Sequence, residues 1–156
     1  MIVVVMGVSG AGKTTVGRAV AAALGWPFVD ADELHPRANL EKMARGEPLD
    51  DADRAPWLAA VADKMRALPD GVVACSALKR AYRQQLHVRD DVRFVLLDVP
   101  ATELARRLER RKGHYMPASL LASQLATLER SEDAVVVDGT PPVAAIVADL
   151  RAALRI

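Results

Sequence analysis

Eight residues near the start of the chain have the types and spacing of a loop that binds phosphate. Residues 7–14 read G-V-S-G-A-G-K-T and match the pattern G-x-x-x-x-G-K-[ST]. The glycines allow a tight turn whose backbone N–H groups point at phosphate oxygens, and the lysine adds a cation. An apolar run precedes the motif and a helical pattern follows it. This context favours a phosphate-binding loop over a structural glycine turn.

The motif predicts binding of a nucleoside triphosphate together with Mg²⁺. We expect Lys13 to reach the β- and γ-phosphates as a catalytic residue, and the Thr14 hydroxyl to be a magnesium ligand. The residues expected to hold the nucleotide are Gly7, Val8, Ser9, Gly10, Ala11, Gly12, Lys13, Thr14 and Thr15. A GTPase would need N-K-x-D and a transport ATPase L-S-G-G-Q, and the sequence contains neither. A small phosphotransferase and a nucleotide-gated regulatory domain remain as interpretations.

Two carboxylates, Asp30 and Asp32, follow the second apolar run of the chain. In a doubly wound sheet this is the edge where ligands bind. One carboxylate can hold magnesium through water and the other can accept a proton from an attacking hydroxyl. The alternative is that they only cap the helix that follows, which Asp does well.

A basic cluster occupies residues 106–112, with five basic residues and one acidic residue among seven. A solvated helix end would explain it, because cations are favoured at helix C-termini. A nucleic-acid patch is weaker, because no aromatic residue lies beside the cluster. In a small kinase, such a cluster supplies a lid over the phosphates, and Arg107 and Arg111 would share one helix face.

Strands and helices must alternate to position these groups. The apolar runs predict five strands, at residues 2–6, 27–30, 72–75, 93–99 and 134–138. Helical patterns lie between and after them, at residues 14–24, 37–45, 54–68, 78–88, 101–112, 117–129 and 142–154. We expect Asp53 to cap the helix over 54–68 and Thr102 the helix over 101–112. The pattern predicts an α/β fold, a three-layer, doubly wound sheet of five parallel strands.

Length and composition set the outer limits. A chain of 156 residues makes about one domain, and 21 Lys and Arg against 20 Asp and Glu give a net charge of +1. That balance argues against a protein that coats nucleic acid. The single cysteine excludes an internal disulfide. No apolar run reaches the roughly 18 to 20 residues of a membrane helix. We therefore expect no membrane partner and a cytoplasmic protein.

Several uncommon strings in the chain resemble those of gluconokinases. They are D-A-D-E-L-H-P at 30–36, G-E-P-L at 46–49, P-W-L at 56–58, C-S-A-L-K-R at 75–80 and R-K-G-H at 111–114. The resemblance runs from the phosphate loop to the last strand. It implies ATP-dependent phosphorylation of D-gluconate at the 6-hydroxyl, on a fold shared with shikimate and nucleoside monophosphate kinases. It also implies a homodimer.

For this reaction we expect Asp32 to accept the proton and Asp30 to hold the metal through water. The resemblance supports Arg111 as the catalytic lid arginine, and it implies that Arg107 and Pro141 lie beside the adenine. The residues expected to bind gluconate are Asp32, His35, Arg37, Lys79, Arg83 and Gln124. Lys79 and Arg83 rank highest, because they are spaced i and i+4 after the C-S-A-L turn.

The expected organisation is one kinase domain over 1–156, with inserted substrate-binding helices at 36–68 and a lid at 107–130. Gly113 is the expected hinge, and residues 114–116 the covering loop. The link at 130–133 is shorter than is usual in the family, which affects the hinge more than the chemistry. A shikimate-like or other sugar-acid kinase of the same fold is the nearest alternative.

Overall fold

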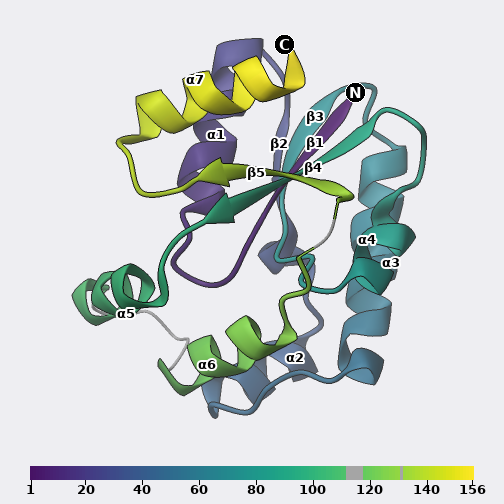
Figure 1. Ribbon diagram of the computed structural model, residues 1–156. Coiled ribbons are helices and arrows are strands. Elements are labelled where there is room, and N and C mark those ends of the chain that lie inside the picture. Colours follow the sequence, from purple (N-terminus) through teal and green to yellow (C-terminus); the bar gives the residue numbers. More distant parts are fainter. Residues whose placement is uncertain (112–117, 131) are drawn as a thin grey trace.

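The computed structural model describes residues 1–111, 118–130 and 132–156, which form a parallel sheet covered by helices on both faces (Figure 1). The strand order is β2-β3-β1-β4-β5, and all four pairings are parallel. The strands are β1 (Ile2–Met6), β2 (Phe28–Asp30), β3 (Gly71–Ala74), β4 (Val92–Asp98) and β5 (Ala134–Asp138). This is the doubly wound α/β sheet that the sequence predicts.

Two apolar cores lie on opposite faces of the sheet, because side chains alternate along a strand. Ile2, Val4 and Met6 of β1 face one core, which includes Trp57 and Leu58. Val3 and Val5 face the other, with Val16, Val20, Ile146 and Leu150. Every β1 residue is buried, which explains why this strand is apolar at each position.

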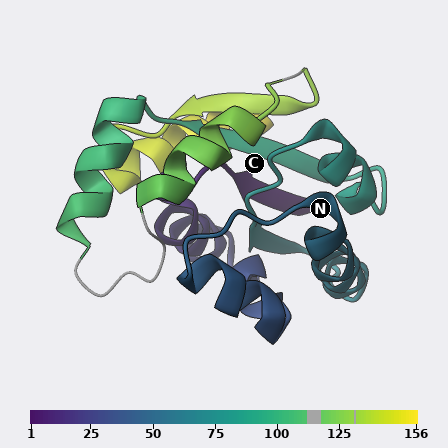
Figure 2. The same cartoon turned by 90° about the horizontal axis from the view of Figure 1, so that it is seen from below.

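The helices divide between these faces. Helices α3 (Asp51–Arg66) and α4 (Arg80–Leu86) cover one core, and α1 (Lys13–Leu24) and α7 (Val143–Leu154) cover the other. A 3₁₀ turn, η1 (Ala31–Leu34), and helices α2 (Arg37–Ala44), α5 (Ala101–Arg110) and α6 (Ala118–Thr127) complete the described elements. Helices α2, α5 and α6 lie beyond the carboxyl ends of the strands (Figures 1 and 2). That edge is where an α/β sheet binds its ligands.

Two predicted helix caps are wrong. Helix α3 begins at Asp51 because Asp50, not Asp53, is its N-cap: the Asp50 carboxylate accepts from Asp53 N at 2.7 Å. The Asp53 carboxylate in turn accepts from Asp50 N at 2.9 Å, which completes a capping box. Helix α5 begins one residue before Thr102, and Pro100 is its N-cap.

Pro56 therefore lies inside α3, on its exposed side, rather than in its first turn. Helix α4 is shorter than its pattern predicts, with Lys79 as its N-cap. Pro117, the expected start of α6, is outside the described residues. In the part of the chain that the structure describes, we find no helix with the length and apolar character needed to cross a membrane.

Candidate active site

The loop between β1 and α1 has the backbone of a phosphate cradle. Gly7, Gly10 and Gly12 all have positive φ, at 148°, 86° and 95°. A Cβ on Gly7 would lie 3.3 Å from the Leu97 carbonyl oxygen, so a side chain there would press against the neighbouring strand. The loop ends at the N-terminus of α1, where the helix dipole favours an anion.

Lys13 is the first residue of α1, and its ammonium group folds back over the loop. Its Nζ donates to the carbonyl oxygen of Val8 at 2.9 Å. Burial lowers the pKa of Lys13 from its ordinary value, and the negative charges of Asp32 and Asp30 oppose that shift. A phosphate anion that enters the loop would attract this ammonium group and stabilise its charged form.

Asp30 connects the acidic pair to the loop. Its Oδ2 accepts from the Thr14 hydroxyl at 3.2 Å, and its Oδ1 accepts from Asp32 N at 3.0 Å. Asp30 thus caps η1, as the alternative interpretation expects, and its other carboxylate oxygen contacts Thr14, the expected magnesium ligand. Within the described residues, no group of three or more His, Cys, Asp or Glu is placed to hold a metal. A hydroxyl and a carboxylate still fit Mg²⁺, which usually takes its other ligands from water and phosphate.

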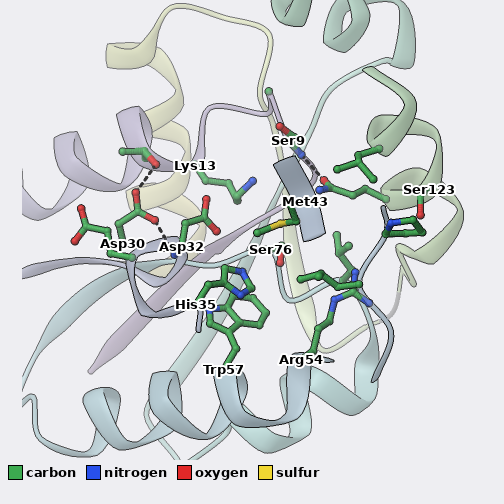
Figure 3. Close-up of a pocket in the computed structure, with 18 of the residues that line it drawn as sticks. Ser9, Lys13, Asp30, Asp32, His35, Met43, Arg54, Trp57, Ser76 and Ser123 are labelled. Atoms are coloured by element: carbon green, nitrogen blue, oxygen red, sulfur yellow. Dashed lines mark hydrogen bonds between the residues drawn. The ribbon is translucent and has the colours of Figure 1, made fainter. Parts of the chain in front are cut away.

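A cavity of about 370 Å³ opens above these groups. Figure 3 shows Lys13, Asp30 and Asp32 close together, with His35 stacked on Trp57 and Arg54 across from the acidic pair. The lining comes from the phosphate loop, η1, helices α2 and α3, the segment after β3, and α6. It includes Ser9, Gly10, Gly12, Lys13, Thr14, Thr15, Asp30, Asp32, His35, Arg54, Ser76, Arg111 and Gln124.

The stacked rings of His35 and Trp57 line the cavity on the side of the inserted helices. Their ring centroids are 4.2 Å apart with an interplanar angle of 11°, and Trp57 Nε1 donates to the Ala31 carbonyl oxygen at 2.7 Å. Trp57 is buried, so it packs the insertion rather than offering a free stacking platform. Burial, with a smaller effect of Arg54, lowers the pKa of His35 to about 4. His35 is therefore neutral near pH 7.

Arg54 is the cation that sequence reasoning missed. It lines the cavity, and its Nη1 donates to the Tyr82 hydroxyl at 3.0 Å. That hydroxyl donates to Asp51, which also accepts from Lys79 Nζ at 3.0 Å. This network holds the guanidinium beside the cavity. Its place in the sequence, five residues after the G-E-P-L string that resembles gluconokinases, is the signal that points to it.

Three expected substrate residues do not line the cavity. Arg37 is 91% exposed and pairs with Glu41 on its own helix. Lys79 pairs with Asp51, and its Nζ lies 5.6 Å from the centroid of the Tyr82 ring. Arg83 is only 1% exposed, and it donates to the carbonyl oxygens of Ala77 and Glu129 and to the Asp133 carboxylate. The i and i+4 spacing of Lys79 and Arg83 brings neither side chain to the cavity: Lys79 is the N-cap of α4 and pairs with Asp51, and Arg83 is buried.

The two arginines expected in the lid, Arg107 and Arg111, have separate positions. Arg111 lines the cavity. Arg107 donates to the carbonyl oxygens of Gly10 at 3.0 Å and Gly139 at 2.9 Å, so it joins the phosphate loop to the segment after β5. The Gln124 side chain accepts from Ser9 N at 2.7 Å. Pro141 is half-buried in the turn before α7, away from the cavity lining. The expected hinge Gly113 and covering loop 114–116 lie outside the described residues.

The sheet order, the phosphate loop and the cavity define a P-loop kinase. The model of the shikimate kinase family matches residues 9–147. The chain is 60% identical to a gluconokinase of Gluconobacter oxydans over 131 residues, which cover 81% of this chain and 74% of that one. The chain therefore belongs to the gluconokinases, within the shikimate kinase family, and is a phosphotransferase.

Two solved kinase structures support this assignment. A gluconokinase from Sinorhizobium meliloti superposes with a TM-score of 0.84 at 45% identity, covering 98% of this chain and 94% of that one. An unliganded sugar kinase from a Janibacter species superposes with a TM-score of 0.93 at 44% identity, covering 99% and 94%. These likenesses span both the nucleotide side and the inserted helices.

Proposed function

We propose that this enzyme transfers the γ-phosphoryl group of ATP to the 6-hydroxyl of D-gluconate, giving 6-phospho-D-gluconate and ADP. The observation that carries the proposal is a cavity bordered on one side by the phosphate loop and on another by His35 and Arg54. Such a cavity can hold a triphosphate end to end with a small hydroxylated anion. The 60% identity to a gluconokinase supports gluconate as that anion.

The loop and α1 bind the nucleotide phosphates through backbone N–H groups and Lys13. Thr14 and Asp30 would hold Mg²⁺, and their 3.2 Å contact supports a shared role. When bound, magnesium supplies positive charge beside the phosphate oxygens. Lys13 and Arg111 both line the cavity, and their positive charges would also stabilise the negative charge of the transferring phosphoryl group. Arg107 holds the loop against the turn after β5, where we propose that Pro141 borders the adenine.

Asp32 is the proposed proton acceptor. A bond forms between the 6-hydroxyl oxygen and the γ-phosphorus while the bond to the β,γ-bridging oxygen breaks, and the hydroxyl proton passes to the Asp32 carboxylate. Support comes from its position in the cavity lining, two residues beyond Asp30, which is the N-cap of η1. A carboxylate within reach of the hydroxyl suits this step.

We assign the carboxylate of gluconate to Arg54 rather than to Lys79 or Arg83. Arg54 lines the cavity, and Tyr82 orients it. A guanidinium can bind a carboxylate with two parallel hydrogen bonds. His35 and Gln124 also line the cavity and remain proposed partners of the hydroxyl groups.

The remaining proposals concern assembly. Residues 107–130 form the proposed lid, whose closure would exclude water from the transferring group. We propose a homodimer, which sedimentation or light scattering of the purified protein will test. We propose the cytoplasm as its location, since the reaction consumes ATP.

An acceptor panel tests the function. Purified protein with ATP and magnesium is given gluconate, shikimate and other sugar acids, and ADP release is followed in a coupled assay. We expect turnover with gluconate well above every other acceptor. A preference for another acid would replace the substrate, and tight ATP binding without turnover on any acceptor would favour a regulatory domain.

A further inference from the structure

Asn39 lies behind His35 and makes two contacts through one nitrogen atom. The side chain is only 4% exposed. Its Nδ2 lies 2.9 Å from the carbonyl oxygen of Asp53 and 3.2 Å from Nδ1 of His35. The amide group of Asn39 therefore connects η1's end to the first turn of α3.

These contacts determine where the histidine carries its hydrogen. A carbonyl oxygen only accepts, so the amide atom that faces Asp53 must be the nitrogen. An amide nitrogen only donates, so His35 Nδ1 must accept and carry no hydrogen. In the neutral ring the hydrogen is then on Nε2.

The surroundings keep the ring in this state. Trp57 stacks on one face, which fixes the ring plane. Asp32 on η1 and Arg54 on α3 line the same cavity as the ring. The Asp53 carboxylate forms an ion pair with Lys42 Nζ at 2.7 Å, so its charge is balanced by Lys42 rather than by the imidazole. Burial and the charge of Arg54 both oppose a second proton on the ring.

We propose that Asn39 is a positioning residue that fixes His35 in the neutral tautomer with hydrogen on Nε2, which makes the ring a hydrogen-bond donor to an oxygen of the acceptor. Its relevance to gluconate rests on the proposed function, whereas the tautomer itself does not. A ring held this way has no free lone pair, so His35 cannot serve as the base. That leaves the proton of the acceptor hydroxyl to Asp32.

Nitrogen NMR of the unmodified protein tests the tautomer directly. Protein labelled with ¹⁵N at histidine is recorded near neutral pH without ligands, and the His35 signals are those lost in His35→Gln. We expect the Nδ1 shift of an unprotonated nitrogen and the Nε2 shift of a protonated one. The opposite tautomer, or an average of the two, overturns the proposal. This result does not depend on any substrate, so it stands or falls separately from the proposed function.

Asn39→Asp gives the kinetic test. A carboxylate cannot donate to Nδ1 and instead favours a hydrogen there, so the neutral ring turns its lone pair on Nε2 toward the acceptor. The same carboxylate raises the pKa of His35, and the cationic ring keeps a hydrogen on Nε2 at low pH. We therefore expect the gluconate KM, relative to the unmodified enzyme, to rise with pH between about 6 and about 9, reaching roughly tenfold, while the ATP KM stays unchanged.

The double variant Asn39→Asp with His35→Gln is the control. It keeps any structural effect of the new carboxylate but has no titrating ring, so its relative KM should not change with pH. A pH-independent KM ratio in the single variant would show that Asn39 only supports the fold, and would overturn the proposal. If the unmodified enzyme does not phosphorylate gluconate, the ratio of variant to unmodified KM is measured with the acid that shows the highest turnover in the acceptor panel.

Discussion

Arg54 and Arg37 carry the same guanidinium group, both on the inserted helices, but they face different surroundings. Arg54 lines the cavity and is oriented by Tyr82, whereas Arg37 is 91% exposed and pairs with Glu41. A charge-assisted hydrogen bond has its full strength only where water is excluded. The position of the side chain, not its type, therefore decides which arginine can select an anionic substrate.

Arg54→Met should raise the KM for gluconate roughly 10- to 100-fold and leave the KM for ATP unchanged, because it removes the cation proposed to bind the carboxylate. Steady-state kinetics with each substrate varied in turn measures this. Arg37→Met is the matched control and should behave like the unmodified enzyme. Equal effects of the two substitutions would contradict the assignment.

Asp32→Asn should reduce kcat by at least about 100-fold while ATP binding persists, because the amide cannot accept the hydroxyl proton. Calorimetry measures binding and the coupled assay measures turnover. Asp149→Asn, an exposed position on α7, is the control for charge. Gluconate turnover at the parent rate would show that another group takes the proton.

At the scale of elements, α4 joins the segment after β3 to the end of α6. Arg83 on α4 donates to the carbonyl oxygens of Ala77 and Glu129 at 2.7 and 2.9 Å. Ala77 has a φ of 45°, a left-handed conformation that a non-glycine residue rarely adopts. The buried guanidinium thus supports a strained turn beside the cavity and also anchors the start of the link toward β5.

Arg83→Met should lower the free energy of unfolding by about 3 kcal/mol, because it leaves the Asp133 carboxylate and two carbonyls without this donor. Urea unfolding measures the loss. Arg80→Met, on the exposed side of the same helix, should cost less than about 0.5 kcal/mol. The folded fraction of Arg83→Met should keep its gluconate KM; a large rise with unchanged stability would return Arg83 to the substrate site.

At the scale of the whole molecule, the neutral His35 makes stability depend on pH. Its pKa is about 4 in the folded protein against 6.5 ordinarily. Below about pH 6.5 the unfolded chain therefore binds a proton that the folded protein does not, so stability is lost as the pH falls. Because the ring is partly open to the cavity, we expect a loss of only about 1 kcal/mol between pH 7 and pH 5.

Unfolding of His35→Gln over the same pH range isolates this contribution. The variant lacks the titrating ring, so its stability should fall less steeply from pH 7 to pH 5 than that of the unmodified protein. Parallel curves would mean that His35 titrates alike in both states, against the burial seen here.

The sequence by itself determined the features that depend on neighbouring residues. The alternation of strands and helices, the all-apolar β1 and the glycine loop follow from local spacing, because backbone conformation and burial on two faces act over a few residues. The sequence also predicted that Asp30 and Asp32 lie at the ligand-binding edge of the sheet, because the carboxyl ends of parallel strands share one edge.

Only the tertiary structure decided which polar side chains meet. Asp50 rather than Asp53 caps α3, and the packing of α3 against the sheet turns Arg54 toward the cavity. Arg83 is buried because Asp133, fifty residues away, pairs with it. The Asn39–His35–Asp53 contacts likewise join separate elements. A periodic pattern predicts a helix but not its rotation about its own axis, and a rotation of one residue moves a charged group from the site to solvent.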